Sequence, residues 1–91
     1  MSIQWLFEVI EERKQNPTSK SYTSSLFTEG LPKIAQKVGE EGTEVVVAAL
    51  AQDDQRLIEE VADLTYHTLV LLAARGLTPA NVVAELEKRH K

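Results

Sequence analysis

A helical segment that is apolar on almost every side sets the strictest limit on how this chain folds. Residues 55–75 have helical character, and between Val61 and Ala74 the apolar side chains fall on several faces rather than along one stripe. A helix of this kind must be covered on more than one side. Because 91 residues supply only one small core, we expect a second copy of the chain to complete the cover in a homodimer.

Shorter stretches of helical periodicity flank this segment. Pro32 and Pro79 lie where a first helical turn tolerates a missing N–H group, and Gly76 suits a helix C-terminus. The short connection at residues 52–54 makes the two longest helices antiparallel. The sequence therefore predicts a single domain over residues 1–91, an all-α antiparallel bundle of about four helices. The predicted helices cover residues 3–14, 31–51, 55–75 and 80–89.

The segment from Thr18 to Thr28 is predicted to be a loop. It is rich in Ser and Thr and lacks helical periodicity, while Tyr22, Leu26 and Phe27 provide apolar anchors. A polar loop that is anchored in this way is suited to binding a ligand.

Composition narrows the function classes. The chain has no cysteine, which excludes disulfides and thiolate metal sites, and its net charge of −4 argues against tight binding of nucleic acid. We see no basic N-terminal stretch followed by an apolar one, and no apolar run approaches the roughly 20 residues that span a bilayer. We therefore expect a cytoplasmic protein with a small-molecule substrate and no nucleic-acid or membrane partner.

Two rows of polar side chains run along the edges of the apolar faces of the second and third predicted helices. If the rows face each other, four carboxylates converge at the margin of the core, where like charges disfavour joint ionisation. Carboxylate oxygens without thiolates suit Mg²⁺, with Mn²⁺ as a second candidate. The rows consist of Lys37, Glu41 and Glu44 on one helix and Glu60, Asp63 and His67 on the other.

An alternative interpretation is that these acids are simply solvated helix surface, as most acidic clusters are. Glu8 and Glu11 are spaced i, i+3, as Glu41 and Glu44 are, but they have no opposing acidic row. We predict that they face solvent. Gly39 and Gly42 favour a special role for the second helix, because each costs about 1 kcal/mol relative to Ala inside a helix. Close helix packing or close approach of a ligand would explain them.

The pattern Glu41-x-x-Glu44 followed by Glu60-x-x-Asp63 resembles the paired acidic motif of the all-α, MazG-like nucleoside triphosphate pyrophosphohydrolases. The flanking sequence is similar, from about residue 3 to residue 90, to one family in that group, the phosphoribosyl-ATP pyrophosphohydrolases. The segments that carry this resemblance are Ser21-Tyr22-Thr23-Ser24-Ser25-Leu26-Phe27, Gly30-Leu31, Lys33-Ile34, Lys37-Val38-Gly39-Glu40-Glu41, Glu44-Val45-Val46, Ala62-Asp63-Leu64 and Tyr66-His67.

The resemblance implies hydrolysis of phosphoribosyl-ATP to phosphoribosyl-AMP and pyrophosphate, the second step of histidine biosynthesis, with Mg²⁺ as cofactor and a homodimer as the working unit. It implies that Glu41, Glu44, Glu60 and Asp63 hold the metal. Glu40 and Glu41 become the candidate catalytic residues, with Glu40 binding a second ion or orienting the attacking water.

The resemblance also indicates substrate-binding residues, each with a structural alternative. Lys37, and with it Lys33, is placed to contact phosphate, although Lys37 could equally form an ion pair with Glu41. His67 either supports the Asp63 carboxylate by a hydrogen bond or is an ordinary core histidine. The predicted loop either binds phosphate or ribose or is merely solvated, and its candidate contacts are Ser21, Tyr22, Thr23 and Ser24.

Two other functions fit the same sequence features. The first keeps the fold and the metal but acts on another nucleoside triphosphate, as a house-cleaning pyrophosphohydrolase does. The second is a helical dimerisation module whose acids only keep it in solution.

Overall fold

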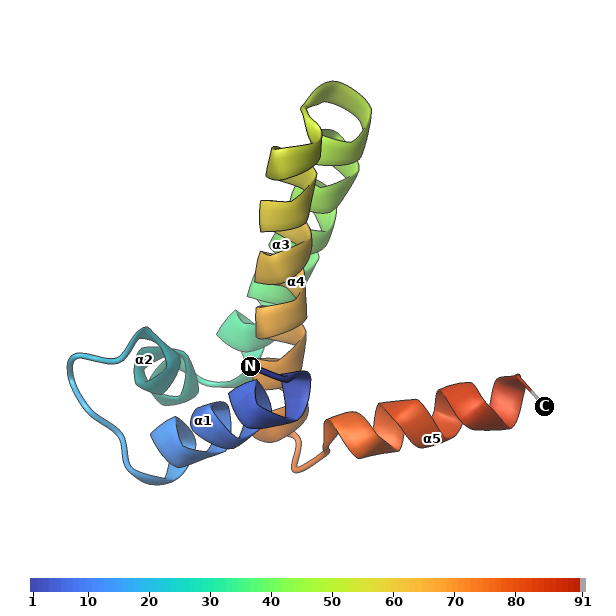
Figure 1. Ribbon diagram of the computed structural model, residues 1–91. Helices are drawn as coiled ribbons and strands as arrows, with labels where there is room; N and C mark the ends of the chain where they lie inside the picture. The colour runs from blue at the N-terminus through green and yellow to red at the C-terminus, as the bar shows by residue number, and fades with distance from the viewer. Residues whose placement is uncertain (91) are drawn as a thin grey trace.

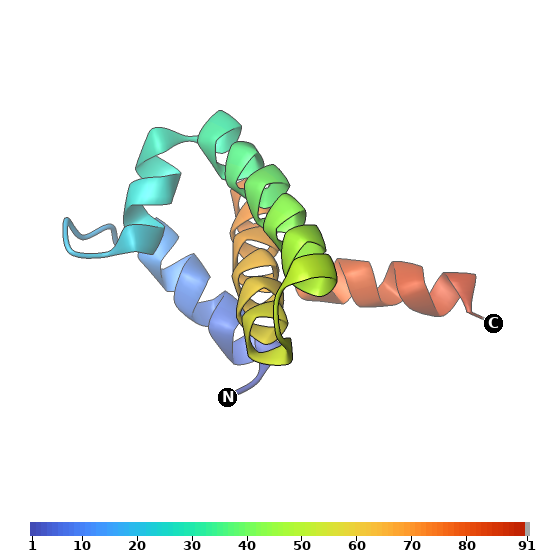
Figure 2. The ribbon, with the colours of Figure 1, turned by 90° about the horizontal axis from the view of Figure 1, so that it is seen from above.

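The computed structural model describes residues 1–90, and every regular element in this range is helical. Two long antiparallel helices, α3 and α4, form a hairpin, and α1 and α2 pack beside one end of it (Figure 1). Figure 2 shows α5 extending from the opposite side of the hairpin. The predicted all-α bundle is confirmed. The helices are α1 (Ile3–Gln15), α2 (Tyr22–Glu29), α3 (Leu31–Ala51), α4 (Asp54–Ala74) and α5 (Pro79–Arg89).

Side-chain caps explain where the helices begin. Ser2 accepts a hydrogen bond from the Trp5 N–H at 3.0 Å at the start of α1, and Asp53 accepts one from the Arg56 N–H at 2.9 Å at the start of α4. Thr78 forms a reciprocal capping box with Asn81 at the start of α5. Because such caps are local, the sequence predicted these helix ends to within one residue.

The core lies at the end of the hairpin where α1 and α2 pack. Its largest fully buried side chains are Ile10, Leu26, Ile34 and Val70, one from each of the first four helices. Burial of each such side chain stabilises the fold by about 1.5–3 kcal/mol. Lys14 adds a hydrogen bond of 2.7 Å from Nζ to the carbonyl of Ala73, which ties α1 to the last turn of α4.

The second helix corrects the prediction of a loop at residues 18–28. Ser21 caps α2 by accepting a hydrogen bond from the Ser24 N–H at 3.1 Å. Leu26 is only 1% exposed in the core, and the Thr28 hydroxyl bonds to the Ser24 carbonyl at 3.1 Å. Burial of Leu26 against distant helices outweighs the weak helix propensity of Ser and Thr, which is a tertiary effect that a local pattern does not contain.

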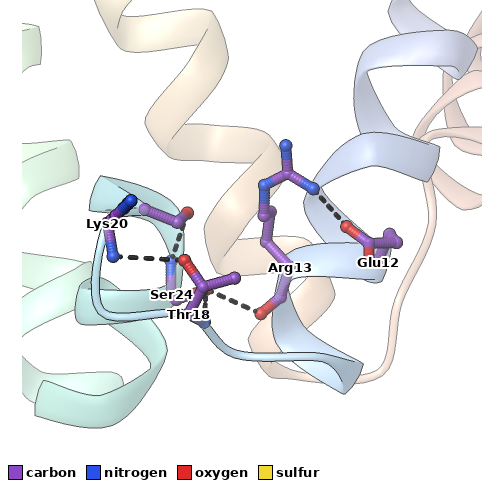
Figure 3. A network of polar contacts seen from close by, with 6 residues as sticks. Glu12, Arg13, Thr18, Lys20 and Ser24 are labelled. Atoms are coloured by element: carbon purple, nitrogen blue, oxygen red, sulfur yellow. Dashed lines mark hydrogen bonds and ion pairs between the residues drawn. The ribbon is translucent and has the colours of Figure 1, made fainter.

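The connection between α1 and α2 is held by one buried hydroxyl. The Ser24 Oγ donates to the Arg13 carbonyl at 3.0 Å and accepts from the Thr18 N–H at 3.2 Å (Figure 3). The Lys20 N–H in turn donates to the Thr18 hydroxyl at 3.1 Å. These bonds fix the path by which the chain enters α2.

The last helix has no buried residue, although one of its faces is apolar. Val82, Val83 and Leu86 on α5 are 44%, 51% and 51% exposed. Among residues 1–90, no helix by itself has both the length and the apolar character to cross a membrane. Only α4 and α5 taken together meet those criteria, as a pair bent by 105°.

Candidate active site

Carboxylates from α3 and α4 converge midway along the hairpin. Glu41 on α3 and Glu60 and Asp63 on α4 each bring one carboxylate oxygen within 4.8 Å of the other two. The Glu41 and Glu60 side chains are only 9% and 6% exposed, whereas Asp63 is open to solvent. The two predicted acidic rows therefore face each other at these three positions.

Two oxygens in this group lack any partner. Glu41 Oε2 and Glu60 Oε2 are both buried, and neither accepts a hydrogen bond. An ionised carboxylate that is buried in this way is costly unless a cation or a proton compensates it. Three carboxylates at this spacing, one of them reachable from solvent, match the donor set of a hard divalent cation.

Glu44 lies at the exposed side of the same group. The nearby carboxyl groups of Glu60 and, second, of Glu41 disfavour the charged form of Glu44 and raise its pKa from its ordinary value of 4.5 to about 7. A proton retained on Glu44 thus offsets part of the repulsion between these acids. A group that titrates near neutral pH can both accept and release a proton there.

A cation flanks the acids on each helix. Lys37 Nζ lies 3.5 Å from Glu41 Oε1 and 3.6 Å from Glu40 Oε1, so the predicted ion pair with Glu41 is present. On α4, the Arg56 guanidinium forms ion pairs with Glu60 and with the exposed Glu59. Sequence reasoning missed Arg56, although its i, i+4 spacing to Glu60 was a usable signal.

The structure does not bring Glu40 into the converging group. Its exposed carboxylate accepts a hydrogen bond from Gln36 Nε2 at 3.0 Å. That bond and the charge of Lys37 lower the pKa of Glu40. Lys33, half-buried one turn before Lys37, forms no ion pair within the part of the chain that the structure describes.

His67 is buried. Its Nδ1 lies 2.8 Å from the backbone carbonyl of Asp63 and not at the Asp63 carboxylate, which fits the alternative of an ordinary core histidine. Because a carbonyl only accepts, Nδ1 donates, and Nε2 then accepts from the Tyr22 hydroxyl at 3.1 Å. Thr23 and Tyr66 form a second hydroxyl pair between the same helices. These contacts attach α2 one turn away from Asp63.

The two other candidate contacts on α2, Ser21 and Ser24, differ in how accessible their side chains are to a ligand. Ser21 is half-buried at the helix N-terminus, where its side chain accepts the capping hydrogen bond. Ser24 is only 2% exposed, and its hydroxyl donates to Arg13 and accepts from Thr18. Its one donor is therefore used within the fold.

Open space adjoins the acids and two glycines of α3. A cavity of about 220 Å³ is lined by Glu44, Val47, Gln52, Arg56 and Glu60. Along α3, a Cβ placed on residue 39 or 42 would meet nothing within 4 Å. Close packing inside this chain therefore does not account for either glycine, which leaves approach of a ligand or of a second chain as the explanation.

Comparison with known proteins adds a family relationship. A family model described as phosphoribosyl-ATP pyrophosphohydrolase matches residues 4–90. The chain is 56% identical to a phosphoribosyl-ATP pyrophosphatase of Lacticaseibacillus casei, over 97% of this chain and 80% of that protein. It is 54% identical to one of Pyrobaculum calidifontis, over 94% and 92%. It is also 52% identical to a bifunctional histidine biosynthesis protein of Vibrio cholerae, over 94% of this chain and 41% of that protein.

Proposed function

The chain belongs to the phosphoribosyl-ATP pyrophosphohydrolase family, and from this we infer that it hydrolyses phosphoribosyl-ATP to phosphoribosyl-AMP and pyrophosphate, a step of histidine biosynthesis. We further propose that the reaction takes place at the acids between α3 and α4. One observation carries this assignment: Glu41, Glu60 and Asp63 converge within 4.8 Å, and two of them hold buried oxygens without partners.

We propose that Mg²⁺, or Mn²⁺ in its place, is held by Glu41, Glu44, Glu60 and Asp63. The unpaired oxygens of Glu41 and Glu60 fit such an ion, because their burial is costly without a positive charge. When bound, the ion neutralises and orients the phosphate chain and lowers the pKa of a water molecule.

The residues around the acids orient the water and the phosphate chain. As a metal ligand, Glu44 gives up the proton that its raised pKa retains in the metal-free protein. Glu41 combines metal binding with a catalytic contact, and Glu40 orients water from the outer side of α3. Lys37, already charged beside Glu41, is placed to pair with a phosphate oxygen.

We propose that α2 contributes the ribose and phosphate contacts through Ser21, Tyr22 and Thr23. Tyr22 and Thr23 are bound to His67 and Tyr66 on α4, so a ligand held by α2 has a defined position relative to Asp63. Lys33 extends the cationic edge of α3 toward the same ligand.

A comparison of substrates tests this function. With Mg²⁺ present, turnover of phosphoribosyl-ATP should exceed that of dCTP and dUTP by orders of magnitude. Preference for either deoxynucleotide would instead identify a house-cleaning enzyme. Absence of turnover on all three, together with no heat on Mg²⁺ titration, would leave only the dimerisation module.

We also propose a cytoplasmic homodimer. The apolar faces of α5 and of the far half of the hairpin are not covered by any of residues 1–90. The exposed fractions there are 51% for Val83, 51% for Leu86, 84% for Leu50 and 61% for Ile58. A second copy would bury this surface. Sedimentation equilibrium should give twice the chain mass, and Leu86→Glu should shift the protein toward monomer.

A further inference from the structure

One carboxylate of the acidic group is shared between a guanidinium and an open position. Glu60 pairs through Oε1 with Arg56, while its Oε2 is buried and has no partner. The same guanidinium pairs with Glu59, and its side chain is 45% exposed. Arg56 is thus a half-exposed cation that pairs with one oxygen of a buried acid.

A divalent cation bound to Glu60 would compete with the Arg56 guanidinium for this carboxylate. Positive charges that share one carboxylate repel each other, and the cost grows as the site loses water. Lys37 lies on the other helix, where it pairs with Glu41 and Glu40 and not with Glu60. The long, half-exposed side chain of Arg56 is free to rotate toward solvent, so it is the partner that gives way.

Space for the displaced guanidinium adjoins its present position. The cavity of about 220 Å³ has Arg56 and Glu60 in its wall, together with Glu44, Val47 and Gln52. A guanidinium is planar, remains charged and matches the spacing of phosphate oxygens with its fork of donors. A phosphate chain that approaches the acids beside this cavity therefore meets the released cation.

We propose that Arg56 changes partners during the catalytic cycle: it neutralises Glu60 in the metal-free protein, is displaced when a divalent cation binds, and then binds a phosphate oxygen of the pyrophosphate moiety. This inference rests on the proposed function, because it needs a divalent ion and a phosphate chain at this site. It assigns Arg56 two successive roles, counter-ion and substrate ligand.

Calorimetry with Mg²⁺ alone tests the first role in the full chain. Arg56→Gln should bind Mg²⁺ about three- to tenfold more tightly than the unaltered protein, because the competing ion pair is gone. Arg89→Gln is the matched control, since it removes another i, i+4 ion pair, with Glu85 on α5, and should leave Mg²⁺ affinity unchanged. Circular dichroism checks that each variant keeps its helices.

Calorimetry with inorganic pyrophosphate at saturating Mg²⁺ tests the second role. Arg56→Gln should bind pyrophosphate about tenfold more weakly, and Arg56→Lys should lie in between, because it keeps the charge but loses the fork. Arg56→Lys also serves if the Gln variant does not fold.

The outcomes separate this inference from the function on which it rests. If the unaltered protein binds no Mg²⁺, the proposed function fails and the inference fails with it. If the unaltered protein binds Mg²⁺ but Arg56→Gln binds it no more tightly, or binds pyrophosphate equally well, only the partner exchange is overturned.

Discussion

Two acidic pairs in this molecule have the same spacing and different surroundings. On α1, Glu8 is exposed and Glu11 half-buried, and neither belongs to a group of carboxylates close enough to share a cation within residues 1–90. On α3, Glu41 and Glu44 have the same i, i+3 spacing, yet Glu41 is buried opposite Glu60.

The difference shows that burial and an opposing row, and not spacing, make the candidate site. On α1, Glu8 faces solvent as predicted, Glu11 is half-buried, and no acidic row lies opposite them within residues 1–90. The α3 pair lies at the margin of the core beside acids of α4, where Glu41 keeps an oxygen without a partner and the pKa of Glu44 rises to about 7. Such a group gains from a cation in a way that the α1 pair cannot.

The largest difference between the two acidic pairs should appear in the activity of variants that lack one of the acids. Glu44→Ala or Asp63→Ala should lower kcat/KM for phosphoribosyl-ATP by about a thousandfold or more, because charge neutralisation of the phosphates depends on the metal ligands. The double replacement of Glu8 and Glu11 by Gln should leave kcat/KM within about twofold.

Far-ultraviolet circular dichroism should show full helix content in these variants. Thermal melting without metal should be unchanged or slightly higher for the α3 and α4 replacements, because they relieve repulsion between carboxylates. A clear loss of folded structure in Glu44→Ala would contradict this account.

Metal binding should stabilise the protein through the acids of α3 and α4 and not through those of α1. At a hundredfold excess of Mg²⁺ over its dissociation constant, the free energy of unfolding should rise by about 2.7 kcal/mol. Chelation with EDTA should remove both this gain and the turnover. Glu60→Gln should abolish the gain in a melting experiment, whereas Glu11→Gln should retain it, and an equal gain in both variants would argue against the site.

The pH dependence of stability should also distinguish the regions. Below pH 4.5 both the folded and the unfolded chain carry the proton of Glu44, so this group has no effect. Between pH 4.5 and about 7 the unfolded chain releases the proton while the folded chain keeps it, so the metal-free protein loses stability as the pH rises. Above about pH 7 both states have released the proton, and the loss of stability is constant.

Melting curves of the protein and of Glu44→Gln across this range measure that contribution. The difference between the two should grow from pH 4.5 to 7 in favour of the variant. Glu8→Gln should show no such trend. Mg²⁺ binding should release protons near pH 7, because the metal replaces the proton on Glu44.

The smallest effect concerns the glycines that bracket Glu41. In the metal-free protein, Gly42→Ala should raise the free energy of unfolding by about 0.5–1 kcal/mol, because the added methyl meets open space and helix propensity improves. If a ligand uses that space, the same variant should show a higher KM. A stabilised variant with unchanged KM and unchanged oligomeric state would show that neither a ligand nor a partner requires Gly42.

Much of the fold and part of the site could be predicted from the sequence. The four long helical segments and the convergence of Glu41, Glu60 and Asp63 agree with the structure, since both depend on helical spacing and one short connection. The loop predicted at residues 18–28 was wrong, because α2 is stabilised by burial of Leu26 among distant helices. The roles of Glu40, of Ser24 and of the remaining candidate contacts stay predictions.

Local chemistry by itself determined where the helices begin and which edge of each helix carries acids, because caps and i, i+3 spacing act within a few residues. Only the tertiary structure decided which charges lose water and which partners they meet. Glu41 and Glu60 are buried with one oxygen each left without a partner, and the Tyr22 hydroxyl reaches His67. These outcomes depend on segments far apart in the chain being packed together, and the cost of burying a charge exists only after that packing.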